Sequence, residues 1–234
     1  MAQNQAQRAR NKAAKEARRK AIVKQKKKEE IVAATPAHQI AAAAACPIFK
    51  CLVMPALFEV GIGQLILARQ LPSGLLGIAF FLIDPYCLGV KDAFYREVGW
   101  EEAEERLWGL GEFVDYDPVC ARRLVTEAAA YAADLGIPPP ADLKVIERLF
   151  GDIDGSTCQQ VFTFGKDGKP FFVAGPNDGP VKIRRILNAL ERKVGPGGFD
   201  YLLPADLNSL AGVDDLIELE DGTDEDEEDE QLPP

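Results

Sequence analysis

Histidine and paired cysteines are nearly absent from this chain of 234 residues. The only histidine is His38, and no CxxC arrangement occurs among the five cysteines, Cys46, Cys51, Cys87, Cys120 and Cys158. A structural zinc site of Cys and His ligands therefore has no paired spacing to build on. A Cys–His or Ser–His catalytic pair would require His38, so this chemistry is disfavoured. We expect the scattered cysteines to be buried as small apolar side chains.

Long apolar runs are also missing. No segment reaches the roughly 18–20 uninterrupted apolar residues that a membrane-spanning helix needs. A secretory signal peptide places an apolar stretch directly after a short basic start, whereas residues 1–30 are rich in charge throughout. We therefore expect a cytoplasmic protein that does not contact a membrane.

Charge is distributed unevenly along the chain. Residues 1–30 contain eleven Lys and Arg and three Glu, a local charge of +8, whereas residues 214–230 contain twelve Asp and Glu and no basic residue. Because the total is −10, residues 31–213 carry the remaining −6. The net charge of −10 by itself argues against generic nucleic-acid binding, but the uneven spread is more informative.

These patterns divide the chain into three parts. Residues 1–45 combine an alanine stripe with Lys and Arg, which predicts a basic helical arm followed by an alanine-rich linker. Residues 46–212 are expected to form an α+β globular body, either as one unit or as subdomains at 46–110 and 111–212. Residues 213–234 are too charged to pack and are expected to form a disordered acidic tail.

The first part of the body is predicted to be a β-hairpin followed by a helix. Residues 64–70 and 75–83 have the apolar character of strands, and a Leu-Pro-Ser-Gly turn joins them. Asp84-Pro85 ends the second strand, and we expect a short helix over residues 90–98. Phe80 and Phe81 should point to opposite faces of their strand, with both faces covered.

A helical middle and a second hairpin–helix unit follow. Asp117-Pro118 predicts the start of a helix that ends before Gly136, and residues 142–150 predict another. An Asp-Gly turn at Asp167-Gly168 predicts a hairpin of strands at residues 161–164 and 170–174. A helix over residues 180–194 and a short strand at residues 199–203 are expected to follow. The body thus contains two β-hairpin–helix (ββα-like) units around a helical middle, either as a duplication or by coincidence.

Two segments resemble those of a known group of sequences. DPYCLGVKDAFY (84–95) and TFGKDGKPFFVAGPNDGPVKIRRIL (163–187) are similar to segments of an uncharacterised group of bacterial proteins, over roughly residues 50–205. The resemblance implies a bacterial origin and a shared fold. It implies no activity and no site residues.

The loop at 175–185 is the best candidate for a ligand site. Its Gly-rich turn leads into a helix N-terminus, where free N–H groups favour anions. Gly179, Lys182 and Arg185 are therefore candidate anion-binding residues. The alternative is an ordinary loop in which Asn177 or Asp178 caps the helix.

Acidic residues suggest a metal site as an alternative. Asp84 ends a buried strand, a position at which carboxylates of nucleases often hold Mg²⁺, and Asp152 and Asp154 flank a single residue. The opposing interpretation places Asp84 in a turn, where it accepts backbone N–H bonds. No cofactor is indicated by any motif.

The basic arm could contact nucleic acid or the ribosome. The alternatives are a solubilising arm that contacts nothing in particular, and an arm that pairs with the acidic tail, which would compete with nucleic acid for it. In the first case, the cationic residues of the arm would contact phosphates of RNA or DNA without reading sequence, because no aromatic residue lies within residues 1–30. These residues are Arg8, Arg10, Lys12, Lys15, Arg18, Arg19, Lys20, Lys24, Lys26, Lys27 and Lys28.

The function we expect is that of a non-enzymatic binding protein that contacts nucleic acid or a ribonucleoprotein through this arm. A metal-dependent hydrolase or nuclease that uses Asp84, and an adaptor for a protein partner, are the alternatives.

Overall fold

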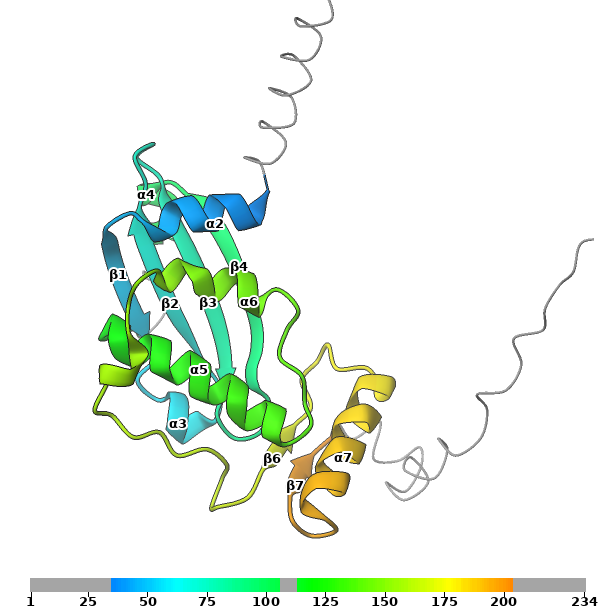
Figure 1. Ribbon diagram of the computed structural model, residues 1–234. Coiled ribbons are helices and arrows are strands. Elements are labelled where there is room, and N and C mark those ends of the chain that lie inside the picture. Colours follow the sequence, from blue (N-terminus) through cyan, green and yellow to red (C-terminus); the bar gives the residue numbers. More distant parts are fainter. Residues whose placement is uncertain (1–34, 106–112, 204–234) are drawn as a thin grey trace, which may run out of the picture.

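The computed structural model describes residues 35–105 and 113–203. They form an α+β fold that contains a five-stranded antiparallel sheet with helices packed on it and a smaller unit built around α7 (Figure 1). The elements are α2 (Pro36–Ala44), β1 (Ile48–Val53), α3 (Leu57–Val60), β2 (Gly63–Gln70), β3 (Leu76–Asp84), β4 (Gly89–Val98), α4 (Trp100–Ala103), β5 (Val114–Asp115), α5 (Pro118–Asp134), α6 (Leu143–Ile146), the 3-10 helices η2 (Glu147–Phe150) and η3 (Gly155–Thr157), β6 (Phe171–Val173), α7 (Pro180–Val194) and β7 (Asp200–Leu202).

The large sheet has the strand order β4-β3-β2-β1-β5. Adjacent residues on β3 point to opposite faces, as expected for a strand. Phe81 is fully buried on one face and stacks on Phe150 at 5.6 Å between ring centroids, while Phe80 stacks on Phe94 of β4 at 4.6 Å. The prediction that the two phenylalanines lie on opposite, covered faces is confirmed.

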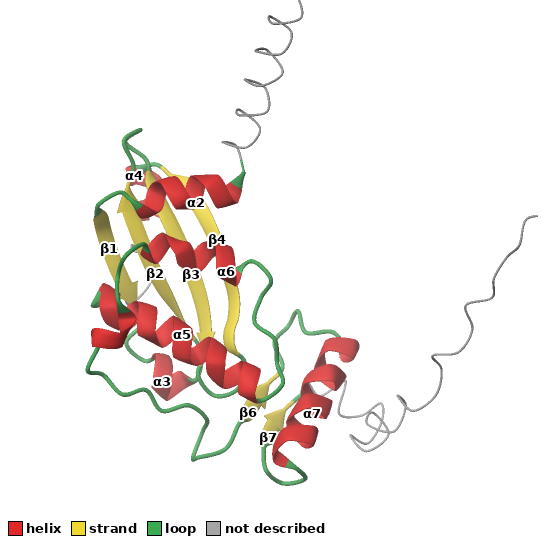
Figure 2. Cartoon of the chain, viewed as in Figure 1, coloured by secondary structure: helices red, strands yellow, loops and turns green. Residues whose placement is uncertain are grey.

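Helices α2, α5 and α6 cover the face of the sheet on which Phe81 lies (Figure 2). The predicted start of α5 is confirmed, because the Asp117 carboxylate accepts a hydrogen bond from the Val119 N–H at 2.9 Å. Gly136 follows the helix with φ of +79°, a conformation that glycine adopts at little cost. The alanine-rich segment expected as a linker contains α2, whose Ile40 and Ala43 are buried in this core.

α5 approaches the beginning of β4 very closely. Gly89 has φ of +61°, and a Cβ atom at this position would lie 2.1 Å from the Ala128 carbonyl oxygen. Any other residue would therefore push the helix away from the sheet.

The predicted helix over residues 180–194 is also confirmed, as α7, and so is a strand near residue 200, as β7.

Arg69 is the buried cation of the sheet, with 6% of its surface exposed. Its guanidinium donates to the carbonyl oxygens of Leu149 (2.7 Å), Phe150 (2.8 Å) and Cys46 (2.5 Å). These three carbonyl groups lie in η2 and just after α2. Without Arg69 they would have no hydrogen-bond donor beside the core.

The smaller unit consists of β6, β7 and α7. β6 and β7 pair in parallel, and Phe172 of β6 is fully buried among Ile183, Leu187 and Leu190 of α7. Leu135, next to the end of α5, belongs to the same apolar cluster. A pair of two short strands is only marginally stable by itself. β6 and β7 therefore rely on packing against α7 and the end of α5.

The helix predicted over residues 90–98 is wrong, because these residues form strand β4. Lys91, Asp92 and Ala93 have no strong strand preference, but Phe94 and Tyr95 do. The adjacent strand β3 offers its backbone N–H and C=O groups along its whole length. Pairing with β3 overrides the weak local preference of these residues.

The first predicted β-hairpin–helix unit therefore lacks its helix, and the second predicted unit lacks its hairpin. Asp167 and Gly168 do adopt positive φ values of 53° and 82°, as a type I′ turn requires. However, the turn closes a single bridge between Lys166 and Lys169, residues 161–164 form no strand, and β6 pairs with β7 instead. The prediction of two β-hairpin–helix units is therefore wrong, although the α+β class is confirmed.

The cysteines also depart from expectation, because Cys120 and Cys158 form a disulfide. Their spacing of 38 residues shows no pattern, and only the packing of η3 against α5 brings them together. Cys51 and Cys87 are free and buried, as predicted. Within the described residues, no helix is long and apolar enough to cross a membrane. The predicted basic arm and acidic tail lie outside these residues.

Candidate functional site

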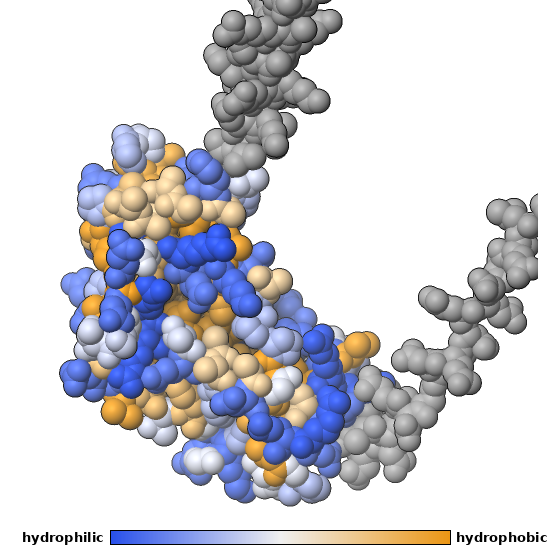
Figure 3. Space-filling view, in the orientation of Figure 1, coloured by the Kyte–Doolittle hydropathy of each residue, from blue (hydrophilic) through white to orange (hydrophobic). Residues whose placement is uncertain are grey.

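α7 combines a buried apolar face with a basic flank. Ile183, Ile186, Leu187 and Leu190 are buried. The exposed cations Lys182, Arg185, Arg192 and Lys193 recur at intervals that place them along one side of the helix. Figure 3 shows hydrophilic residues gathered over this helix. The body is acidic in total, so this flank is a local exception.

Asp178 organises the cations at the beginning of α7. Its side chain is 2% exposed; one carboxylate oxygen lies 2.7 Å from Lys182 Nζ, and the other lies 3.1 Å from Lys91 Nζ. The Gly175 N–H also donates to the carboxylate at 2.7 Å. Burial acts to raise the pKa of Asp178, but these donors together hold it below its usual value.

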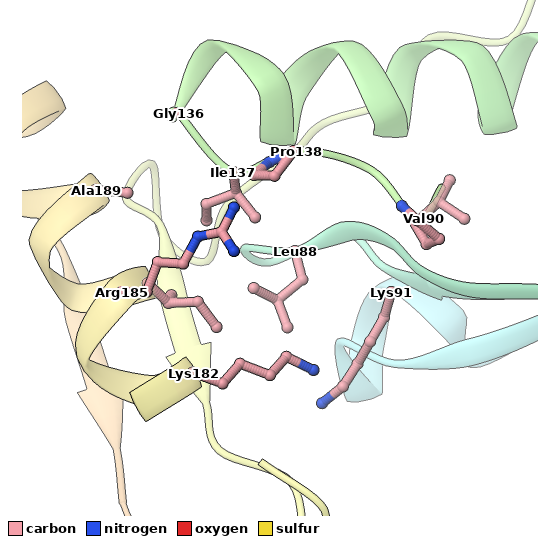
Figure 4. A pocket seen from close by; sticks show the side chains of 11 residues that line it. Leu88, Val90, Lys91, Gly136, Ile137, Pro138, Lys182, Arg185 and Ala189 are labelled. Atoms are coloured by element: carbon pink, nitrogen blue, oxygen red, sulfur yellow. The ribbon is translucent and has the colours of Figure 1, made fainter. Parts of the chain in front are cut away.

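A cleft of about 240 Å³ lies beside this ion-pair network. Its apolar walls come from the β4 start, the linker between α5 and α6, and one side of α7; they include Leu88, Val90, Ile137, Pro138, Pro140, Ile186 and Ala189. In Figure 4, Lys91 and Lys182 point toward each other below Leu88, while Arg185 extends toward Ile137. The cleft is therefore apolar with three cations at its margin.

The structure brings together two of the three residues predicted for the anion site. Lys182 and Arg185 both line the cleft, whereas Gly179 does not. Gly179 is the N-cap of α7, and no side chain caps the helix there, so Asp178 binds lysines and a loop N–H rather than the helix end. Sequence reasoning missed Lys91, because it lies 91 residues before Lys182 on a strand that was predicted to be a helix.

Asp84 occupies the turn between β3 and β4. Its Oδ1 accepts hydrogen bonds from the Cys87 N–H at 2.9 Å and the Tyr86 N–H at 3.1 Å. Burial raises the pKa of Asp84 to about 6, although these N–H groups and Lys91 act in the opposite direction. The turn-forming interpretation of Asp84 thus matches the geometry.

The other candidate carboxylates are engaged in local structure. Asp154 accepts from the Ser156 N–H at 3.0 Å and caps η3, and Arg122 donates to the backbone carbonyls of Gly151 and Ile153 in the same loop. Asp152 lines a shallow groove in this loop with Asp154. Within residues 35–105 and 113–203, no three His, Cys, Asp or Glu side chains are grouped in a way that could hold a metal ion.

Comparison with known proteins gives no further guidance. No protein-family model, curated protein or solved structure matches the chain. The cations of the arm, residues 8–28, lie outside the described residues, so their arrangement adds nothing to the geometry of the site.

Proposed function

We propose that this chain is a non-enzymatic binding protein that contacts the phosphates of nucleic acid or a ribonucleoprotein. The contacts would come from the basic arm at residues 1–30 and from the basic flank of α7. The observation that supports this proposal best is the flank itself, where four exposed cations lie along one helix of an acidic body. The arm adds a local charge of +8.

Cations of this kind bind by neutralising phosphates and releasing counterions, and this contribution does not depend on base sequence. The flank has no exposed aromatic side chain that could stack on bases; within α7 its exposed apolar residues are Val181 and Val194. Binding should therefore be strong at low salt, weak at high salt and insensitive to sequence.

The geometry around Asp84 favours this function over a hydrolase. A metal-binding carboxylate needs free oxygen lone pairs and other ligands around it. Asp84 uses Oδ1 for two N–H bonds of its own turn, and Cys87 beside it is buried. The carboxylate thus has a structural task that accounts for its position.

A cytoplasmic location belongs to the same proposal, because nucleic acid is abundant there. The Cys120–Cys158 disulfide weighs against it, since disulfides persist mainly in oxidising compartments.

The experiment is a titration of a fluorescent DNA or RNA oligonucleotide, read by anisotropy, with three proteins. These are the full chain, a deletion of residues 1–30, and the double variant Arg192→Gln/Lys193→Gln. We expect both changes to weaken binding at low salt, and the deletion to weaken it more, because it removes more cations.

The matched control is Lys144→Gln/Arg148→Gln, which removes the same charge from exposed positions on α6 and η2. It should bind nearly as tightly as the full chain. If the control and the α7 variant lose the same affinity, only net charge matters and the flank has no role. If the deletion binds as well as the full chain, the arm is not a contact surface.

A further inference from the structure

The cleft beside α7 has the chemistry of a small-molecule site. Its walls are apolar, with Leu88, Val90 and Ile186 each at most 5% exposed. Three cationic side chains, Lys91, Lys182 and Arg185, line its margin (Figure 4). Ligand sites in proteins typically combine apolar walls with a few polar groups that orient the ligand.

The cations exceed the acid available to neutralise them. Asp178 divides its two oxygens between Lys91 and Lys182. Within the part of the chain that the structure describes, Arg185 has no ion pair, and its side chain is exposed. One anionic group on a ligand would therefore find an arginine whose planar fork matches a carboxylate or a phosphate.

The two lysines differ in how firmly they are held. Lys91 is 15% exposed and pairs with a carboxylate that is 2% exposed, so its place is fixed by burial. Lys182 is 54% exposed, and an exposed ion pair contributes little stability. Lys182 can therefore turn from Asp178 to a ligand while Lys91 keeps the buried carboxylate neutralised.

We propose that this cleft binds a small amphiphile that has a short apolar chain and one anionic headgroup, either a carboxylate or a phosphate. The chain would lie against Leu88, Ile137 and Ile186, with the headgroup at Arg185 and Lys182. At about 240 Å³ the cleft is somewhat smaller than the pockets that hold drug-sized ligands, which suits a short apolar chain. This site shares Lys182 and Arg185 with the basic flank of α7 but does not involve the arm, and binding measured without nucleic acid tests it separately from the proposed function.

The test is isothermal titration calorimetry of the full chain with octanoate, octyl phosphate, octanol and octylamine. We expect saturable binding of the two anions, with octanol about fivefold weaker and octylamine weaker still, because the exposed cations contribute a modest electrostatic preference. Binding of octanoate but not octyl phosphate assigns the headgroup as a carboxylate, and the converse assigns it as a phosphate.

Two variants locate the ligand. Arg185→Gln should weaken the anions about fivefold and leave octanol unchanged. Ala189→Leu places a larger side chain in the cleft wall and should weaken the anions and octanol together. Lys144→Gln, at an exposed lysine on α6 outside the cleft and outside the flank, is the control and should bind like the parent chain.

Arg185 is exposed, so its variant should fold normally, as a circular dichroism melt would verify. The proposal is overturned if neither anion binds saturably. It is equally overturned if Arg185→Gln and Ala189→Leu, both folded, bind the anions as tightly as the parent chain.

Discussion

The sheet region and the α7 region each bury one carboxylate, and the two are treated in opposite ways. Asp84, at the end of β3, accepts N–H bonds within its own turn, and burial raises its pKa to about 6. Asp178, before α7, binds two lysines, and its pKa lies below the usual value. The first acid shapes a turn between strands, whereas the second holds cations in place at the surface. The same kind of side chain thus shapes the backbone in one region and orders lysine side chains in the other.

The largest expected effect comes from the core of the sheet. Phe81 is fully buried and stacks on Phe150, so Phe81→Ala should lower the free energy of unfolding by about 3–5 kcal/mol. Phe94→Ala is the matched control on β4; Phe94 is 43% exposed, so a loss of about 1 kcal/mol is expected. Urea denaturation measures both, and equal losses would contradict the burial pattern.

The next effect concerns the disulfide. Cys120→Ser opens a loop of 38 residues and should reduce stability by about 2–4 kcal/mol in the loop-entropy account. Cys46 is free and partly exposed, so the control substitution Cys46→Ser should change the stability very little. Addition of a reducing agent should lower the melting temperature of the parent chain and leave Cys120→Ser unchanged. A parent chain insensitive to reduction would show that the disulfide adds no stability.

Asp84 provides a pH-dependent prediction. Because its pKa is raised in the folded state, the folded protein retains a proton between about pH 4 and 6 that the unfolded chain has lost. Stability should therefore fall as pH rises through this window. Asp84→Asn keeps an oxygen acceptor and has no such titration.

Between pH 4 and pH 7, the parent should therefore lose on the order of 2–3 kcal/mol of unfolding free energy relative to Asp84→Asn. Chemical denaturation at several pH values measures this difference. Melts with Mg²⁺ or Mn²⁺ complete the experiment: a cation-dependent rise in the parent that is lost in the variant would instead favour the hydrolase alternative.

The smallest effect is expected in the α7 region. Asp178→Asn removes both lysine pairs and should cost about 1 kcal/mol at pH 7, because Lys182 is exposed and Lys91 is left unpaired. Its pKa is lowered in the folded state, so the stabilisation should disappear as pH falls below about 4. A cost that does not decrease as pH is lowered progressively below about 4, as far as the protein stays folded, would show that the ion pairs are not its source.

The contrast between the regions also explains what the sequence could predict. α5 and α7 were predictable because Pro at their first position and Gly beyond their last mark both ends. The strand at residues 75–83 was predictable from its continuous apolar run. β4 was not, because a register shift interrupts its alternation, although its pairing partner β3 is the strand directly before it.

In the cleft beside α7, too, the residues related by local spacing were predictable and those brought together by tertiary packing were not. Lys182 and Arg185 lie one turn apart on α7, a relation that sequence spacing contains. Lys91 and the walls at Ile137 join them only through tertiary packing. The disulfide between Cys120 and Cys158 depends in the same way on η3 packing against α5, and no local pattern records it.

The most direct test of the proposed function is the salt dependence of nucleic-acid binding by the full chain and by the chain without residues 1–30. On duplex DNA, each phosphate contact contributes about −0.9 to the slope of log affinity against log salt concentration. The account predicts a steep slope for the full chain and a shallower one for the deletion, by several such contributions. Equal slopes, or affinity that does not change with salt, would contradict it.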